Sequence, residues 1–358
     1  MQNLKINPLP SKTWNWLHMN ESELTEVTVA ASNAVKTECP AKISRSLADT
    51  MPLETIGTGM GSDMDRLAAE AGVIPNVYTI AAGEKEQSPL RLHFDYAEGE
   101  KALNVIGLNA AENSEMTVIM DYTAPQKSGG LAAIQTKLFV ANHARIRLIQ
   151  IERLGEEFIC LNDIGGVCAD GARLEVIHLV LGGKNVYQGC QVDLAGDESS
   201  FKADIGYRLQ GTDKLDMNYV ALHYGKKSES EINVSGVLRD QAFKLFRGTI
   251  DFKTGSSASV GGEKEDVLLM DDTVVNQTIP LILCGEEDVQ GNHGATIGRL
   301  GEDLIFYLAS RGISHEEIYE MMARARIDAV CRKIPDETTQ SEIQQYLEDG
   351  DGNEDEHG

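Results

Sequence analysis

Residues 173–181 read RLEVIHLVL, in which every second position from 174 to 180 is Leu174, Val176, His178 and Val180. A period of two with β-branched residues is typical of a strand that buries one of its faces. The same period occurs in residues 91–96 (RLHFDY), 117–122 (TVIMDY) and 145–151 (RIRLIQI). These runs predict a mainly β central region.

Proline is absent from residues 126 to 279. Because proline lacks the N–H that a sheet ladder needs, this gap suits one long, continuously paired sheet. Glycine-containing turn signals such as Gly129-Gly130 and Gly182-Gly183 separate the apolar runs. Many short strands with regular turns indicate a sandwich, a barrel or a β-solenoid. The absence of a fixed-length repeat leaves all three open.

The two ends of the chain differ from its centre. We expect a helical N-terminal region over residues 1–88, a β core over 89–288, a helical C-terminal region over 289–347 and an acidic, disordered tail over 348–358. Gly72 is a suitable stop for a helix beginning near residue 64. Ser314 and Glu317 have the spacing of a capping box at the start of a C-terminal helix.

The composition excludes several classes of function. The 358 residues include 32 Lys and Arg against 56 Asp and Glu, a formal charge of −24. Such a surface repels phosphate backbones and anionic lipids, so we expect neither nucleic acid nor membrane as a partner. No apolar run is long enough to span a bilayer, and the first residues lack the layout of a secretory signal. We therefore expect a cytoplasmic protein.

The six cysteines, at positions 39, 160, 168, 190, 284 and 331, form no CxxC pair. Their spacing fits neither a zinc site nor a ferredoxin site. The chain also lacks a GxxxxGK[ST] phosphate-binding loop. We expect no stably bound cofactor and no hydrolysis of ATP by this chain itself.

Residues 267–322 resemble the C-terminal part of the SufB/SufD family, which belongs to the SUF machinery for iron–sulfur cluster assembly. The matching positions are Pro280, Asp288-Val289, HGATIG (293–298), FYL (306–308) and SRGI (310–313). The resemblance implies a right-handed parallel β-helix core with helical regions at both ends, which selects the solenoid among the three β folds. It also implies a scaffold subunit, not an enzyme, that pairs with a SufB-like chain and docks the SufC ATPase. Iron or a cluster would then be held transiently, and a flavin is compatible with the full complex.

Two departures from the family pattern bear on the subtype. A cysteine that SufB proteins carry a few residues before the strand proline has no counterpart near Val274, which favours the SufD branch. Many SufD proteins have Cys-Ser-His before Gly-Ala-Thr, whereas here the triplet is Gly291-Asn292-His293. The alternatives are a SufB-like chain that pairs with itself and works with SufC and, more remotely, a carbohydrate-active enzyme on a β-solenoid.

His293 is the first candidate site residue. A neutral imidazole suits iron, and its unperturbed pKa of about 6.5 leaves it mostly able to coordinate at neutral pH. A histidine that only hydrogen-bonds a turn is the alternative. The family resemblance makes His293 a candidate ligand at an interface with the partner. Cys284 could supply a thiolate, although a small buried hydrophobic role is commoner for such a cysteine.

A second candidate surface lies in the C-terminal helical region. The resemblance implies that Phe306, Tyr307, Arg311, Gly312 and Ile313 form a docking region for SufC, and packing of a helix onto the core is the alternative. Within the core, we expect His178 and the cysteines at positions 160, 168 and 190 to be buried structural residues. No role is assigned to His223.

Overall fold

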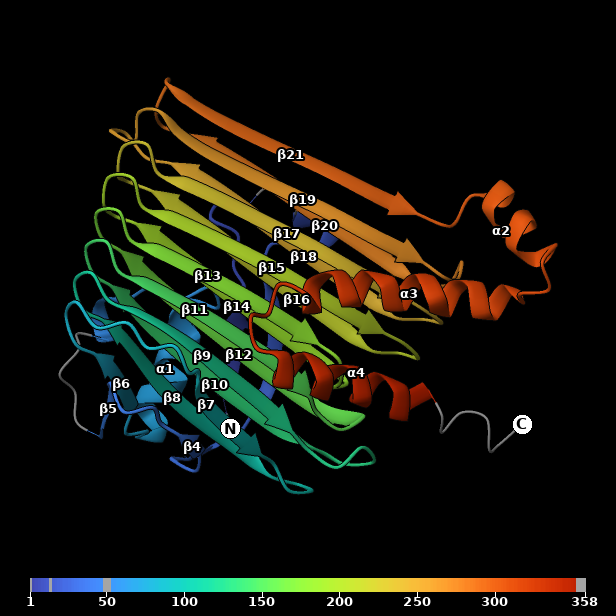
Figure 1. Cartoon of the computed structure of the whole chain (residues 1–358), viewed down its shortest axis with the longest axis horizontal. Helices are drawn as coiled ribbons and strands as arrows, with labels where there is room; N and C mark the ends of the chain where they lie inside the picture. The colour runs from blue at the N-terminus through green and yellow to red at the C-terminus, as the bar shows by residue number, and fades with distance from the viewer. Residues whose placement is uncertain (1, 13–14, 48–52, 352–358) are drawn as a thin grey trace.

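The computed structural model describes residues 2–12, 15–47 and 53–351. Its core is a parallel β-helix made of two facing sheets whose strands alternate along the chain (Figure 1). This confirms the parallel β-helix that the resemblance implied. The four alternating runs of the sequence are all strands of one of these sheets. Each turn of the solenoid contributes one strand to each sheet, and we call such a turn a rung.

From β6 onward the even-numbered strands form sheet I, in the order β20 (Val275–Cys284), β18 (Phe243–Phe252), β16 (Lys214–His223), β14 (Asn185–Leu194), β12 (Glu157–Cys168), β10 (Gly129–Val140), β8 (Lys101–Ala110) and β6 (Asn76–Ile80). The short strand β5 (Ile43–Ser46) pairs antiparallel with β6, and β3 (Ala30–Ala31) pairs with β8.

From β7 onward the odd-numbered strands form sheet II, in the order β21 (Val289–Gly298), β19 (Ser259–Leu269), β17 (Glu229–Leu238), β15 (Ser200–Leu209), β13 (Arg173–Val180), β11 (Arg145–Arg153), β9 (Glu115–Thr123) and β7 (Leu90–Asp95). Strand β4 (Lys36–Glu38) pairs antiparallel with β7. Strands β1 (Gln2–Ile6) and β2 (Ser22–Val27) form a separate antiparallel pair.

The interior between the two sheets, called the lumen below, holds the main hydrophobic core. Because side chains alternate along a strand, each strand sends every second residue into the lumen. In parallel register these residues stack into columns that run from rung to rung. One column contains Val176, Ala203 and Ile232, which are successive register partners and are all buried. A solenoid of this kind buries apolar surface only when its rungs stack.

The N-terminal segment covers the outer face of sheet I. Helix α1 (Ser62–Ala71) packs Met64 and Leu67 into a buried cluster with Leu103 and Leu161 of the sheet. The helix ends at Gly72, which adopts the left-handed conformation with φ of 68°, as predicted. Two short 3-10 helices, η1 (Asn15–Leu17) and η2 (Leu53–Thr55), also belong to this segment.

The C-terminal helices cover the outer face of sheet II (Figure 1). Helix α3 (His315–Cys331) begins with the predicted capping box of Ser314 and Glu317. Its residues Ile327 and Val330 pack against isoleucines of the sheet. Full burial of one such side chain contributes roughly 1.5–3 kcal/mol. Helix α4 (Glu337–Asp351) continues this layer, whereas α2 (Glu302–Ala309) projects beyond the end of β21 and buries none of its residues.

Three expectations about the ends need correction. The stretch 1–88 holds α1, but most of its regular structure consists of short strands, because it pairs with and covers the β-helix. Residues 289–298 are strand β21, not part of a helical region. Helix α4 continues to Asp351, into the predicted tail, and residues 352–358 lie outside the described residues.

The two ends of the β-helix are built differently. At the first end, the short antiparallel strands β4 and β5 close the sheets and carry charged residues such as Lys36 and Arg45. At the other end, β20 and β21 are ten residues long, and no strand of the described chain pairs with their outer edges. Pro280 within β20 is consistent with an edge strand. The last rung therefore presents a long open edge.

The docking of the N-terminal segment onto sheet I includes a buried carboxylate. Asp163 of β12 accepts hydrogen bonds from the Met60 backbone N–H at 2.9 Å and from the Gln135 side chain at 3.0 Å. Burial raises the pKa of Asp163 from 3.8 to about 6. Because the unfolded chain loses this proton at lower pH than the folded chain, the contribution of Asp163 to stability falls as pH rises from about 4 to about 6.

We expect the free energy of unfolding of the wild type, relative to the Asp163→Asn variant, to fall by up to about 3 kcal/mol between pH 4 and pH 6. Urea denaturation at a series of pH values measures this difference. The variant Glu198→Gln, at an exposed turn position, serves as the control and should follow the wild type within about 0.5 kcal/mol. A pH-independent difference between wild type and Asp163→Asn would contradict the assignment.

Candidate functional site at the open end of the lumen

His293 and Cys284 both lie on the last rung. His293 is in the middle of β21 and pairs in register with Glu263 of β19. Cys284 is the last residue of β20 and pairs with Phe252. Since Glu263 and Phe252 are buried in lumen-facing positions, both candidates belong to lumen-facing columns. Both are nevertheless exposed, because no further rung covers them.

The exposure of Cys284 corrects the expectation of a buried hydrophobic residue. The strand pairs regularly through both residues, and Ile282 lies against Gly291 of the facing sheet, so Ile282 and Cys284 share the lumen side as predicted. His293 and Cys284 stand in different columns and on different sheets. Across the described residues, His, Cys, Asp and Glu side chains nowhere form a group of three or more placed to hold a metal ion.

The columns change character at the open end. The column that ends at His293 contains Val176, Ala203 and Ile232, and then Glu263 directly beneath the histidine. Neighbouring columns change from apolar to polar at the same level. We call this polar end the lumen mouth and define it by six residues: Lys244, Glu263, Glu265, Asn276, Thr278 and His293.

Lys244 and Glu265 form a buried ion pair in the lumen mouth. The Lys244 ammonium donates to the Glu265 carboxylate, to Thr278 Oγ1 at 3.0 Å and to the Gln277 carbonyl at 3.3 Å. Thr278 Oγ1 in turn donates to Glu265 Oε2 at 2.8 Å. Burial lowers the pKa of Lys244, and the neighbouring Glu265 opposes this shift. The pair is therefore held by hydrogen bonds on both of its sides.

Glu263 has no such support. The residue is only 7 % exposed, and no group of the described chain donates a hydrogen bond to its carboxylate. The pKa of Glu263 is raised from 4.5 to about 7, mainly by burial and also by the negative charge of Glu265. The carboxylate lies over Gly248, where an added Cβ would come within 2.0 Å of Glu263 Oε2. The missing side chain at Gly248 makes room for this carboxylate.

The predicted docking residues lie together on and after α2. Phe306 is 77 % exposed and Tyr307 is 53 % exposed. The Arg311 guanidinium lies over the Tyr307 ring, 5.0 Å from its centroid. Gly312 has a φ of 89°, which ends this helical segment, and Ile313 is half-buried. The geometry shows an exposed aromatic pair, and its partner stays a prediction.

The interior histidines are structural. As predicted, His178 is fully buried, with its Nε2 2.9 Å from Glu152 Oε1 and its Nδ1 3.0 Å from the Tyr219 hydroxyl. His223 lies between Ser228 and Ser230, at 2.7 and 2.8 Å, and burial lowers its pKa to about 4. The cysteines at positions 160, 168 and 190 are also buried, as predicted.

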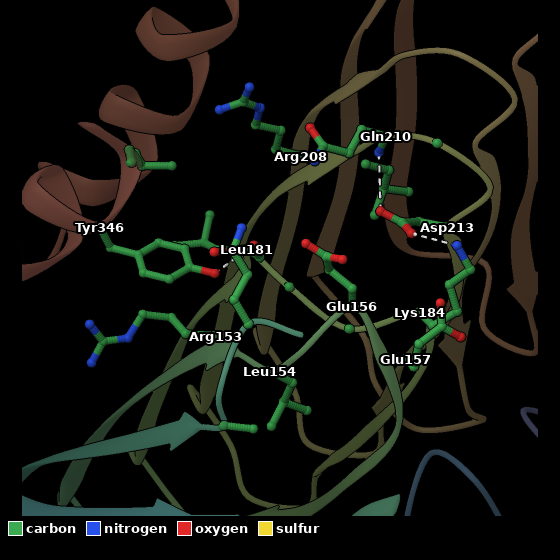
Figure 2. Close-up of a pocket in the computed structure, with 17 residues that line it drawn as sticks. Arg153, Leu154, Glu156, Glu157, Leu181, Lys184, Arg208, Gln210, Asp213 and Tyr346 are labelled. Atoms are coloured by element: carbon green, nitrogen blue, oxygen red, sulfur yellow. Dashed lines mark hydrogen bonds and ion pairs between the residues drawn. The ribbon is translucent and has the colours of Figure 1, made fainter. Parts of the chain in front are cut away.

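A hollow with a volume of about 600 Å³ lies between α4 and the carboxyl ends of β9, β11, β13 and β15. Figure 2 shows Tyr346 close to Leu181 and Arg153, and Asp213 between Gln210 and Lys184. The Tyr346 hydroxyl donates to the Leu181 carbonyl at 3.4 Å. The charged groups here are largely paired, for example Lys184 with Asp213 at 3.6 Å. The hollow is a seam between α4 and the strand ends, remote from His293 in the fold.

Comparison with known families decides the membership of the chain. Residues 95–326 match the family model described as "SUF system FeS cluster assembly, SufBD core domain". The chain belongs to the SufB/SufD family. The matched range covers the β-helix from β8 to β21 and continues into α3. The candidate residues of the lumen mouth and α2 therefore lie inside the matched domain.

Several SufB/SufD relatives are similar over parts of the chain. An iron–sulfur cluster assembly SufBD family protein of Mycobacterium tuberculosis is 27 % identical over 215 residues, which are 60 % of this chain and 25 % of the relative. SufD of Bacillus subtilis is 29 % identical over 127 residues, 36 % of this chain and 29 % of that protein. SufB of the same bacterium is 23 % identical over 263 residues, 72 % of this chain and 56 % of SufB. The chain thus spans a quarter to just over half of these relatives.

Sequence reasoning missed most of the lumen mouth. It identified His293 from the family motif but overlooked Glu263 and Glu265. A signal was present, because these two acids stand in phase with Val267, at alternate positions that face inward, whereas Lys264 faces outward. Charged residues that alternate in phase with a core position are buried, and buried charged residues usually belong to an ion pair or a functional site.

We expect Lys244→Met to destabilise the protein by about 3–5 kcal/mol, because it leaves the Glu265 charge buried and unpaired. The double variant Lys244→Met with Glu265→Gln should recover part of this loss, and urea denaturation of the four proteins of the cycle measures the coupling. The control is Lys264→Met, an exposed residue between the two glutamates. Equal losses in Lys244→Met and Lys264→Met would contradict a buried pair.

Proposed function

We propose that this chain is a non-catalytic, SufD-type scaffold subunit of the SUF iron–sulfur cluster assembly complex. It pairs with a SufB-like chain through the open end of its β-helix and docks the SufC ATPase through the α2 region. The observation that carries this proposal is the asymmetry of the β-helix, whose first end is closed and whose last rung exposes two long edge strands around a polar lumen mouth.

The open end supports pairing with a second chain. Edge strands present unpaired N–H and C=O groups and readily pair with another strand, so proteins usually shorten or cover them. Here the first end is protected in this way and the last is not. Val275 and Ile297, which are 41 % and 42 % exposed, add apolar surface to the last rung. A partner with the same family fold could continue both sheets across this end.

The lumen mouth supports a role in handling iron as cargo. His293 offers an imidazole at the exposed end of a lumen-facing column. Imidazole and carboxylate groups are suitable iron ligands. Because the described residues bring no third such donor together, a complete site needs ligands from the partner. This fits a scaffold that holds iron or a cluster transiently at an interface, not a resident cofactor.

The α2 region supports docking of another protein. Phe306, Tyr307 and the Arg311 guanidinium that stacks on the tyrosine form a compact exposed group of aromatic and cationic side chains. Such residues are enriched among those that contribute most to protein–protein binding. Since α2 contributes nothing buried to its own domain, binding of a partner is a sufficient reason for its apolar side chains.

The SufD subtype rests on the residues near the lumen mouth. Val274, at the position where SufB proteins carry a cysteine, precedes β20 and packs partly against the lumen core. A residue in that packing role offers no sulfur ligand. The competing proposal is a SufB-like chain that pairs with itself, and the longer match to SufB keeps it as the second candidate. Co-expression distinguishes the two by showing whether the assembly is a heterodimer or a homodimer.

We expect the wild-type chain, co-expressed with a SufB-like subunit and SufC, to co-elute with both on size exclusion. We expect His293→Ala to form the same complex but to lose most of the iron acquired during anaerobic reconstitution, because one ligand is removed. Iron content and visible absorption measure this loss. Free monomer from the wild-type co-expression would overturn the scaffold proposal, and unchanged iron in His293→Ala would overturn the ligand role.

We expect the double variant Phe306→Ala, Tyr307→Ala to lose SufC from the complex while keeping the SufB-like subunit. Truncation of central aromatic residues at an interface typically costs at least about 2 kcal/mol, or roughly 30-fold in affinity. Pull-down of SufC on the immobilised chain measures the effect. The control is Met321→Ala, an exposed apolar residue of α3. Loss of both partners from the double variant would argue against a separate docking region.

A further inference from the structure

Glu263 is a buried carboxylate that lacks an obvious structural purpose. Removing an ionised carboxylate from water is costly unless it is paired or bound to a cation. In the described chain, nothing donates a hydrogen bond to it. Its position on β19 and the gap at Gly248 keep the carboxylate inside the lumen. Buried groups that remain unsatisfied often belong to functional sites.

The nearest cation is already committed. An ammonium group has three N–H donors. Those of Lys244 are used by the Glu265 carboxylate, Thr278 Oγ1 and the Gln277 carbonyl. The Thr278 hydroxyl proton is used by Glu265 as well. The hydrogen bonds of the lumen mouth therefore satisfy Glu265 and leave its neighbour Glu263 without a donor.

The position of Glu263 relates it directly to His293. The two residues are register partners on adjacent strands, so they face the same side of sheet II on consecutive rungs. Neighbouring strands lie about 4.8 Å apart. Metal–ligand bonds to imidazole nitrogen and carboxylate oxygen are about 2.0–2.2 Å long for an ion such as Zn²⁺, so one ion joins ligand atoms that are at most about 4.4 Å apart. Side chains on neighbouring strands come within that separation when they lean slightly toward each other. One small divalent cation can therefore contact both side chains.

A second unsatisfied acceptor lies elsewhere on the last rung. Asn276 lies on β20, in register with Lys244, and so belongs to the lumen-facing side of sheet I. Its Oδ1 is buried and has no hydrogen-bond partner within the described residues. Pro280, the register partner of the Gly248 that Glu263 lies over, is four residues further along β20, or roughly 13 Å. Asn276 is therefore outside the pair formed by Glu263 and His293.

We propose that Glu263 binds the Fe²⁺ cargo together with His293, as the anionic ligand that this chain contributes to a site completed by its partner. This inference rests on the proposed scaffold function and identifies a further residue of the same site. His293 approaches the ion from the exposed last rung, and Glu263 approaches it from one rung deeper in the lumen. The carboxylate partly neutralises the positive charge brought by the bound cation and holds the cation at the lumen mouth.

The test uses the complex of the full chain with a SufB-like subunit and SufC. Anaerobic equilibrium dialysis against Fe²⁺ gives its affinity, and Co²⁺ absorption in the visible range reports the ligand set without cluster assembly. The variants are Glu263→Gln, which keeps the shape of the side chain, and His293→Ala. The control is Glu231→Gln, an exposed acid on the outer side of the neighbouring strand β17.

We expect Glu263→Gln to lower the Fe²⁺ affinity at least tenfold and to change the Co²⁺ spectrum, with unchanged subunit stoichiometry. Glu231→Gln should match the wild type. An intact complex in which Glu263→Gln keeps wild-type affinity, while His293→Ala loses it, would overturn this inference and leave the scaffold function standing. A wild-type chain that forms no complex would overturn both.

Discussion

The parallel register between consecutive rungs is the constraint on which the rest of this structure depends. Each strand pairs with the strand one turn later, and the inward side chains stack directly upon their counterparts. A position in one rung therefore shares its environment with the equivalent positions in all the others. Most columns stay apolar because an isolated polar group inside the lumen would have no partner. Polar groups in the middle rungs, such as His178 and Glu152, are paired with each other.

The same constraint explains why polar groups gather at the last rung. A lumen-facing side chain at the end of the solenoid has no rung above it and can reach solvent or another protein. The column of Val176, Ala203 and Ile232 becomes polar only at Glu263 and His293. Chemistry can thus be placed at the end of a column without disturbing the core beneath it. The closed first end offers no equivalent position, because β4 and β5 cover it.

Much of the fold was predictable from the sequence because strand alternation is a local signal. The runs at residues 91–96, 117–122, 145–151 and 173–181 correspond to β7, β9, β11 and β13. The closure into a β-helix was not predictable from the pattern, because the length of a rung varies. Ile159 pairs with Asn185 and Phe243 with Val275, so one turn takes 26 residues in one place and 32 in another. The family resemblance supplied that step.

The turns and the site show two further limits. His143, Glu198 and Lys227 adopt positive φ at equivalent turns, and their backbone N–H groups donate to the next rung, as Gly171 does at the turn between His143 and Glu198. Only Gly171 has the residue type that this backbone conformation favours, so at the other three turns tertiary hydrogen bonds override local preference and the residue itself gives no turn signal. At the site, the motif identified His293, but Glu263 became visible only when the register placed it beneath that histidine. The partner of a stacked residue lies about one rung away in sequence, where no local pattern connects the two.

Charged residues inside the last rungs reduce stability, and the N-terminal segment compensates by packing on the outer face of the same strands. Leu9 and Met19 pack against Leu245 and Ile279, on the outer faces of β18 and β20. The buried Arg247 side chain donates to the Met19 carbonyl at 2.7 Å and pairs with Asp216. Residues from the start of the chain thereby hold the last strands of sheet I through their outer face. Because that face supplies the packing, the inner face of the same strands can carry Lys244, Thr278 and the unpaired Asn276 without loss of the fold.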